Sequence, residues 1–99
     1  MKKLVFLEPL GIHQESLEKL VQEKIGDQME VVYYPDRRED PEELVRRSQG
    51  AHVVVLSNFK YGREVMERCP ELEMVCVAFT GVDHVDVEYC RQRGIMVCN

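Results

Sequence analysis

An apolar run that leads into a glycine turn is the feature that most constrains this chain. Residues Met74–Phe79 have the length and composition of a strand that is buried on both faces. The run breaks at Thr80-Gly81, where a residue without a Cβ allows a sharp turn. Asp83 and Asp86 follow, and each can accept backbone N–H groups at a helix start. Because open α/β sheets place ligands where a parallel strand turns into a helix, this stretch predicts both a fold class and a site.

Four further apolar runs repeat the pattern along the chain. Together with Met74–Phe79 they predict strands at Lys3–Leu7, Met29–Tyr33, Ala51–Leu56 and Ile95–Cys98. Helical spacing and end signals predict helices at Gln14–Lys24, between Asp40 and Gly50, at Arg63–Arg68 and at Val87–Arg93. Strands separated by helices pair in parallel through right-handed crossovers. We therefore expect an α/β fold with an open parallel five-stranded sheet and helices on both faces.

Capping signals support two of these helices. Asp40 precedes Pro41, which suits the first helical position, and Glu43 stands where a capping box places its carboxylate. Asp86 can cap the last helix in the same way. We favour this structural role over ligand binding for both Asp83 and Asp86.

Charge and composition exclude several function classes. With 99 residues, 44% of them apolar, the chain has the composition of one soluble globular domain. A net charge of −5 argues against a nucleic-acid partner, and the pairs Arg37-Arg38 and Arg46-Arg47 are interpreted as a solvated charged face. The apolar run Leu4–Leu7 is too short for a signal peptide or a membrane span, so we expect a cytoplasmic protein without a membrane partner.

Cysteine and histidine positions do not suggest a metal site. The four cysteines and three histidines show no ligand spacing, so we assign no metal ligand. Cys76 and Cys98 lie within apolar runs and are expected to be small, reduced core residues.

The residues from Pro70 to Asn99 carry a family pattern. An apolar strand runs into Gly81-Val82-Asp83-His84-Val85-Asp86, and the chain ends in Arg-Gly-Ile-Met-Val-Cys-Asn. This resembles the D-isomer-specific 2-hydroxyacid dehydrogenases, which typically show P-x-L-K, an apolar strand, G-V-D-[HN]-[IV]-D, a helix and R-G-I-x-V-x-N. Glu73 stands where that family commonly has lysine. The resemblance is close from Pro70 onward and looser before it.

The resemblance implies a two-domain oxidoreductase. Its first domain is flavodoxin-like and helps to bind a small 2-oxo or 2-hydroxy acid, and its second is a Rossmann domain that holds NAD or NADP and the catalytic residues. Residues 1–99 resemble the first domain, cut near the hinge to the second. No G-x-G-x-x-G occurs here, so we assign no cofactor-binding or catalytic residue. The isolated piece is expected to bind no cofactor and to be inactive.

Two loops match the substrate-facing positions of that family. They comprise Ser57, Asn58 and Phe59 after the third predicted strand, and Phe79, Thr80 and Gly81 after the fourth. Main-chain N–H groups and small polar side chains at strand carboxyl ends can hold a carboxylate. We interpret Asn58 and Phe79 as substrate contacts, whereas Thr80 and Gly81 fit a substrate contact and a simple turn equally well.

Two departures from the family pattern bear on the substrate. The phosphoglycerate branch often carries arginine before the serine of the first loop, and Leu56 stands there in this chain. This favours a small, unphosphorylated oxo acid. Phe79 replaces a residue that is small in many members, which would narrow the pocket.

Other readings of the same pattern remain open. One alternative is a non-catalytic binding or dimerisation module of the same fold, as in co-repressor relatives. A G-x-G-x-x-G beyond residue 99, with later Arg, Glu and His, would favour the enzyme over this module. A phospho-receiver domain needs an aspartate at the end of the third strand, where Ser57 stands. Residues 8–13 lack the hydroxyl-rich phosphate loop of a flavodoxin. A C-terminal helix that covers the first domain in the family is absent from this sequence, so we expect an exposed apolar surface and a homodimer.

Overall fold

Nine elements alternate along the chain in the computed structural model, which describes residues 1–11, 13–78 and 81–98. In order, they are β1 (Lys2–Phe6), α1 (Gln14–Lys24), β2 (Met29–Tyr33), α2 (Pro41–Ser48), β3 (Val53–Leu56), α3 (Arg63–Met66), β4 (Met74–Val77), α4 (Val87–Arg93) and β5 (Met96–Cys98). The predicted alternation of strands and helices is confirmed.

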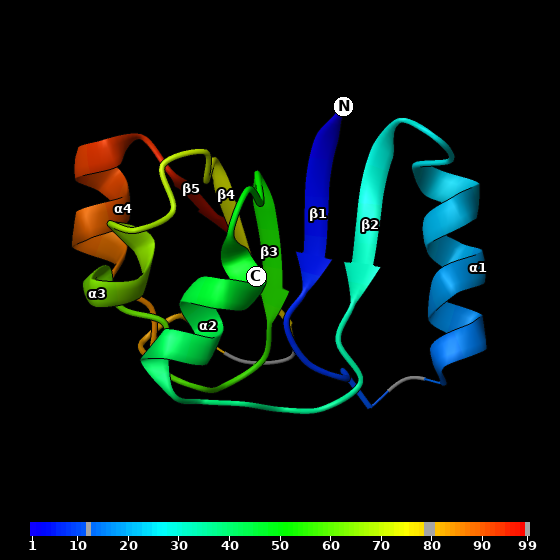
Figure 1. Ribbon diagram of the computed structural model, residues 1–99, viewed down its shortest axis with the longest axis horizontal. Coiled ribbons are helices and arrows are strands. Elements are labelled where there is room, and N and C mark those ends of the chain that lie inside the picture. The colour runs from blue at the N-terminus through cyan, green and yellow to red at the C-terminus, as the bar shows by residue number, and fades with distance from the viewer. Residues whose placement is uncertain (12, 79–80, 99) are drawn as a thin grey trace.

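The strands form one parallel sheet in the order β2-β1-β3-β4-β5. The chain moves from β1 outward to β2, then returns past β1 to β3 and continues in the opposite direction. The strand order therefore reverses between β1 and β3, as in flavodoxin-like folds, and ligands of such sheets bind outside the strand carboxyl ends at this point. In Figure 1 the arrowheads of β1, β2 and β3 point toward the same edge.

Helices cover both faces of the sheet, as expected. Helices α2, α3 and α4 pack on one face, where they share the larger core with alternate residues of the strands, such as Val54 and Val75. Helix α1 lies on the opposite face, where Leu17 packs against Leu4 and Phe6. The Phe6 ring also stacks on that of Tyr33, with the centroids 5.0 Å apart.

Helix α1 covers only part of its face. Register pairs Val53 with Met74 and Met74 with Met96, so these residues share the α1 face of the sheet, and Met96 at the β5 edge is 60% exposed. Cys76 and Cys98, which were expected in the core, lie half-buried on the same face with their sulfur atoms 3.2 Å apart. Burial, followed by the hydrogen bond from Cys98, raises the pKa of Cys76 to about 12.

The predicted caps are present, with one difference. The Asp40 carboxylate accepts from the Glu43 N–H at 3.2 Å, and Asp86 accepts from the Tyr89 N–H at 3.0 Å. The Glu43 carboxylate was expected to return to Asp40 but instead accepts from the Arg46 and Arg47 guanidinium groups. These arginines lie on the same side of α2 as Glu43, three and four positions along, where they compete successfully for its carboxylate.

Element boundaries either match the prediction or differ from it by one or two residues. Helix α3 ends at Met66 rather than Arg68, because the N–H groups of Arg68 and Cys69 bond three residues back, to the carbonyls of Val65 and Met66. Strand β3 begins at Val53 rather than Ala51. Strand β4 ends at Val77, and the predicted strand end at Phe79 falls outside the described residues.

Candidate functional site

The described residues on either side of the two predicted loops lie next to each other at the carboxyl edge of the sheet. The Ala78 N–H donates to the Leu56 carbonyl at 2.8 Å, so the residues that precede the loops are hydrogen-bonded neighbours. Further along, Tyr61 and Val85 form a parallel bridge, and the Tyr61 N–H donates to the His84 carbonyl at 2.9 Å. The chain segments that enter and leave the two loops are therefore neighbours at Leu56 and Ala78 and again at Tyr61 and Val85.

The three residues of the first loop differ in exposure. Asn58 is exposed and Ser57 is half-buried. Phe59 is only 1% exposed and belongs to the larger core. The Asn58 side chain is thus open to a ligand, whereas the Phe59 ring anchors the loop to the core.

Of the second loop, Gly81 is described and is exposed. A Cβ built at Gly81 meets no heavy atom of the described residues within 4 Å, so the turn is open at this position. Phe79 and Thr80 lie outside the described residues, as does Asn99 at the predicted hinge, and their roles stay predictions.

Glu8, the second residue after β1, lies at this edge, and the sequence analysis did not identify it. Its side chain is 3% exposed, and its Oε2 accepts from the Ser57 N–H at 2.8 Å. The main-chain donor that was expected to bind a substrate carboxylate is therefore occupied by the chain's own carboxylate. A charged residue immediately after a buried strand, at the edge where Ser57 was also placed, was the available signal.

Arg37 reaches the same loop from the segment after β2. Its Nη1 lies 3.6 Å from Glu8 Oε1 and donates to Asn58 Oδ1 at 2.5 Å. The guanidinium carbon lies 5.6 Å from the centroid of the Phe59 ring. Arg37 was interpreted as part of a solvated face, but it contacts residues of the candidate site.

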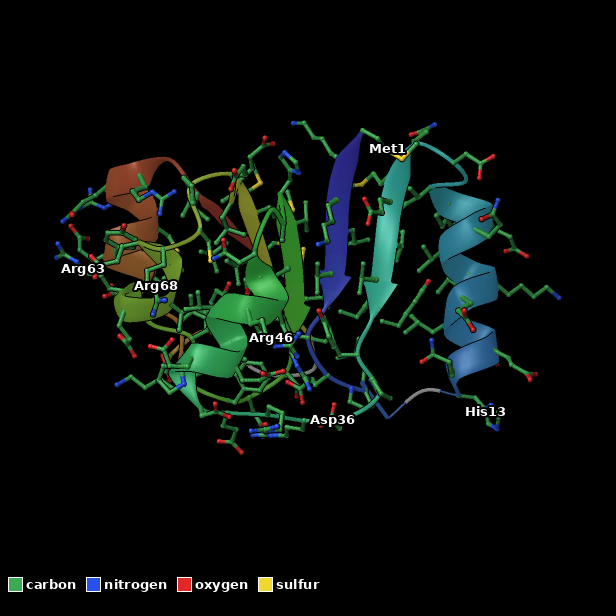
Figure 2. All side chains as sticks on the ribbon, viewed as in Figure 1. Met1, His13, Asp36, Arg46, Arg63 and Arg68 are labelled. Atoms are coloured by element: carbon green, nitrogen blue, oxygen red, sulfur yellow. The ribbon has the colours of Figure 1, made fainter. Side chains whose placement is uncertain are left out.

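Arg47 of α2 is buried, which also corrects the solvated-face interpretation. The side chain is 4% exposed, and its Nη1 donates to the carbonyls of Leu7 at 3.2 Å and Asp36 at 2.8 Å. Its Nη2 donates to Asp36 Oδ1 at 2.6 Å, and its guanidinium lies over the Tyr34 ring. Arg47 therefore fixes the residues immediately before Glu8 and Arg37. Figure 2 labels Asp36 beyond the arrowhead end of the strands.

Comparisons with known proteins agree with this arrangement. The family model described as "D-isomer specific 2-hydroxyacid dehydrogenase, catalytic domain" matches residues 4–99. The chain belongs to this family. Glycerate dehydrogenase from Methylorubrum extorquens is 34% identical over 99% of this chain and 29% of its own length, and hydroxypyruvate reductase from Blautia hydrogenotrophica is 32% identical over 98% and 30%.

A solved structure of the same fold shows how the chain compares in three dimensions. The NAD+-bound 3-phosphoglycerate dehydrogenase of Entamoeba histolytica matches with a TM-score of 0.78 and 24% identity, over 97% of this chain and 32% of that one. The chain thus spans about a third of the length of the relatives that it matches.

A hollow beside the two loops of this dehydrogenase-family chain has mixed charge. It has a volume of about 360 Å³ and is lined by Lys60, Gly62, Arg63, Glu64, Asp83, His84, Val85 and Asp86. The His84 Nε2 atom is buried with no hydrogen-bond partner among the described residues. Both basic and acidic side chains line the hollow, so its charge selects neither anions nor cations.

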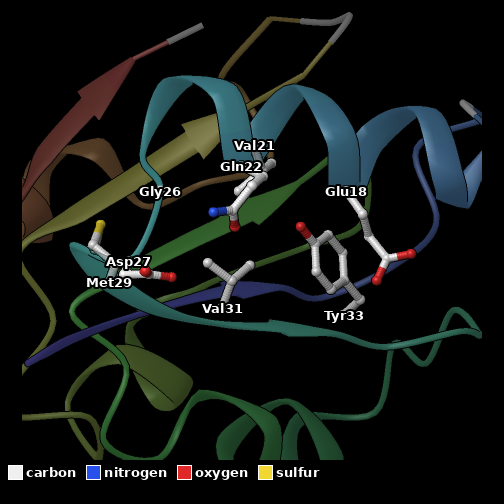
Figure 3. A pocket seen from close by; sticks show the side chains of 8 residues that line it. All are labelled: Glu18, Val21, Gln22, Gly26, Asp27, Met29, Val31 and Tyr33. Atoms are coloured by element: carbon white, nitrogen blue, oxygen red, sulfur yellow. The ribbon is translucent and has the colours of Figure 1, made fainter.

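A second hollow, of about 240 Å³, lies between α1 and β2 (Figure 3). Glu18 and Tyr33 lie at one end and Asp27 and Met29 at the other. Burial, and secondly the Glu18 charge, raises the pKa of Tyr33. None of its lining residues belongs to the loops after β3 and β4, so it is separate from the candidate site of this family member.

The described part of this chain, residues 1–11, 13–78 and 81–98, offers neither a metal site nor a membrane-spanning helix. It contains no group of three or more His, Cys, Asp or Glu side chains arranged to hold a metal ion. None of its helices combines the length and apolar character needed to cross a membrane.

Proposed function

We propose that this chain is the substrate-side domain of an NAD(P)-dependent oxidoreductase that acts on the CH–OH group of small D-2-hydroxy acids or reduces the corresponding 2-oxo acids. The proposal is supported by the pairing of residues on either side of the loops after β3 and β4 at the carboxyl edge, beside the β1–β3 reversal, in a member of this family. Because the chain spans about a third of its relatives, this activity belongs to the whole protein.

In this proposal the chain's own residues bind and orient the acid. The exposed Asn58 side chain and the turn at Phe79–Gly81 supply donors to the substrate oxygens. NAD or NADP supplies or accepts the hydride. Because residues 1–99 contain no G-x-G-x-x-G, we assign the residues that contact this cofactor to a second domain. Closure of two domains over the acid would align the reactants and exclude water.

The substrate class in this proposal is small and unphosphorylated. Leu56, at the position where the phosphoglycerate branch often has arginine, is fully buried in the larger core. An apolar side chain that points into the core provides no hydrogen-bond donor or positive charge for a phosphate.

We also propose that the chain is cytoplasmic and self-associates through the open face of β4 and β5.

Steady-state kinetics of the full-length protein that contains this sequence test the proposal. We expect NADH- or NADPH-dependent reduction of glyoxylate or hydroxypyruvate with a higher kcat/KM than for 3-phosphohydroxypyruvate. Asn58→Ala should lower kcat/KM by about 10- to 100-fold, as expected for one lost hydrogen bond to a charged group. Gln22→Ala, at the separate hollow between α1 and β2, is the matched control. No turnover of any 2-oxo acid would favour the non-catalytic alternative.

A further inference from the structure

We propose that Arg37 is a positioning residue: it holds the Asn58 amide so that the NH₂ group, and not the carbonyl oxygen, faces the bound acid. This rests on the proposed function. The proposal adds Arg37, from the segment after β2, to the residues that determine specificity. It also states that Asn58 acts as a hydrogen-bond donor to the acid and not as an acceptor.

The guanidinium of Arg37 is held on several sides. Nη1 donates to Asn58 Oδ1 at 2.5 Å and lies 3.6 Å from Glu8 Oε1, and Nε donates to Glu39 Oε2 at 3.1 Å. One face lies over the buried Phe59 ring at 5.6 Å. Contacts with three polar partners and an aromatic ring define the position of a side chain that is otherwise 39% exposed.

The chemistry of the guanidinium decides the orientation of the amide. Arginine carries five N–H donors and no acceptor, so it can bond only to the oxygen end of Asn58. With Oδ1 turned toward Arg37, the two Nδ2–H donors point away from it, on a side chain that is exposed. Without Arg37, an exposed asparagine amide could present either end to a ligand.

The support beneath this pair is itself buried. Glu8 is 3% exposed and binds the Ser57 N–H, so it fixes the residue before Asn58 and faces the Arg37 charge. Arg47 bonds the carbonyls of Leu7 and Asp36, the residues before Glu8 and Arg37. The start of the loop and the base of Arg37 are thus held by one network, which limits the freedom of the Arg37–Asn58 bond.

The ligand class follows from the donor orientation. Two N–H donors beside a cationic group match the oxygen atoms of a carboxylate or a 2-oxo group, which accept hydrogen bonds. A ligand that presents N–H donors at this place would meet no acceptor on Asn58.

The test compares four variants of the full-length protein: Arg37→Met, Arg37→Lys, Asn58→Asp and Arg38→Met. Arg37→Met should raise KM for glyoxylate about tenfold, as for one hydrogen bond to a charged group, with kcat changed less than about twofold. Arg37→Lys should have a KM closer to that of wild type than to that of Arg37→Met, because an ammonium group also donates only to Oδ1 of Asn58. Asn58→Asp should raise KM at least as much, since it removes the donors. Arg38, which pairs with Asp40, is the control and should leave both constants unchanged.

A second measurement separates this proposal from the proposed function. The side-chain NH₂ signals of Asn58 in a ¹⁵N-labelled sample report the amide orientation without turnover. Their ¹⁵N–¹H heteronuclear NOE should fall in Arg37→Met, because the amide then reorients about the Cβ–Cγ bond, and should stay high in Arg38→Met. Unchanged Asn58 signals and an unchanged KM in Arg37→Met would overturn the proposal. Restricted Asn58 signals in a wild-type protein that turns over no 2-oxo acid would overturn the proposed function alone and leave the Arg37–Asn58 geometry intact.

Discussion

Two buried polar side chains, Ser48 of α2 and Tyr61 after β3, meet inside the larger core. Both are fully buried, and their hydroxyl groups lie 2.9 Å apart. Burial raises the pKa of Tyr61, so its phenol is neutral at ordinary pH. Because Tyr61 also pairs with Val85, the Ser48–Tyr61 hydrogen bond connects α2 to the segment that follows the second loop.

Removal of one of these hydroxyl groups should destabilise the protein. Tyr61→Phe leaves the Ser48 hydroxyl buried without its partner and should cost about 1–3 kcal/mol of unfolding free energy. The double variant with Ser48→Ala should lose less unfolding free energy than the sum of the two single variants, because the second substitution removes the unpaired Ser48 hydroxyl. Urea denaturation of the two single variants and the double variant measures the coupling. Strictly additive losses would show that the two hydroxyl groups do not interact.

Residue-level roles at this edge were only partly predictable. The caps Asp40 and Asp86 were recognised from local spacing. Asn58 is exposed after a strand, and its contact with a substrate stays a prediction. Arg47 was misinterpreted, because its partners are the Leu7 carbonyl, 40 positions away, and Asp36. An arginine within a charged segment is expected to be solvated when only its neighbours in sequence are considered. Its burial depends on hydrogen-bond acceptors that only the fold brings close to it, so no local sequence pattern predicts it.

At the scale of elements, helix α2 shows how a short helix is fixed at this edge. Asp40 caps its start, and Leu44 and Val45 pack into the larger core. The Glu43 carboxylate accepts from Arg46 and Arg47 in its second turn. These guanidinium groups, Arg46 first and Arg47 second, lower the pKa of Glu43 from 4.5 to about 2.

This shift predicts an acid-dependent contribution of Glu43 to stability. The folded-state pKa is lower than the unfolded one, so the contribution is fully present above about pH 4.5 and is lost as pH falls toward 2. Glu43→Gln should therefore be less stable than wild type at pH 7, and the difference should shrink steadily below pH 4.5. Denaturant unfolding at several pH values tests this, with Glu71→Gln at an exposed site as the matched control. A difference in unfolding free energy between wild type and Glu43→Gln that is constant from pH 7 to pH 2.5 would contradict this prediction.

The sequence predicted which elements form better than where they end. Apolar runs and capping residues located all nine elements, because each depends on neighbours within one or two turns. The early end of α3 depends on backbone bonds that tighten the chain before Pro70. The late start of β3 depends on which residues β1 and β4 can pair with, which is a property of the assembled sheet.

For the molecule as a whole, the uneven covering of the sheet is the feature with physical consequences. Three helices cover one face, whereas α1 covers the β1–β2 side of the other. Alternation of strands and helices predicted the parallel sheet and its two covered faces. It could not predict that Met74, Cys76 and Met96 would share an open area, because that depends on strand register.

An apolar open area at a sheet edge should promote self-association of this chain. Met96→Lys places a charge at the most exposed position of β5 and should shift the chain toward monomer, by at least about tenfold in dissociation constant. Leu20→Lys, at an exposed apolar residue of α1, is the matched control and should have no such effect. Sedimentation velocity over a concentration series provides the measurement. A wild-type chain that stays monomeric at high concentration would rule out this surface as a contact.

The buried Arg47 has a consequence for how new preferences can arise in such a protein. It joins the ends of β1 and β2 to α2, so this corner behaves as a rigid frame, while the exposed Asn58 side chain contacts the frame only through Arg37. Variation can therefore accumulate at position 58 at little cost to folding. Directed evolution toward other acids should therefore randomise position 58 and keep Arg47 unchanged.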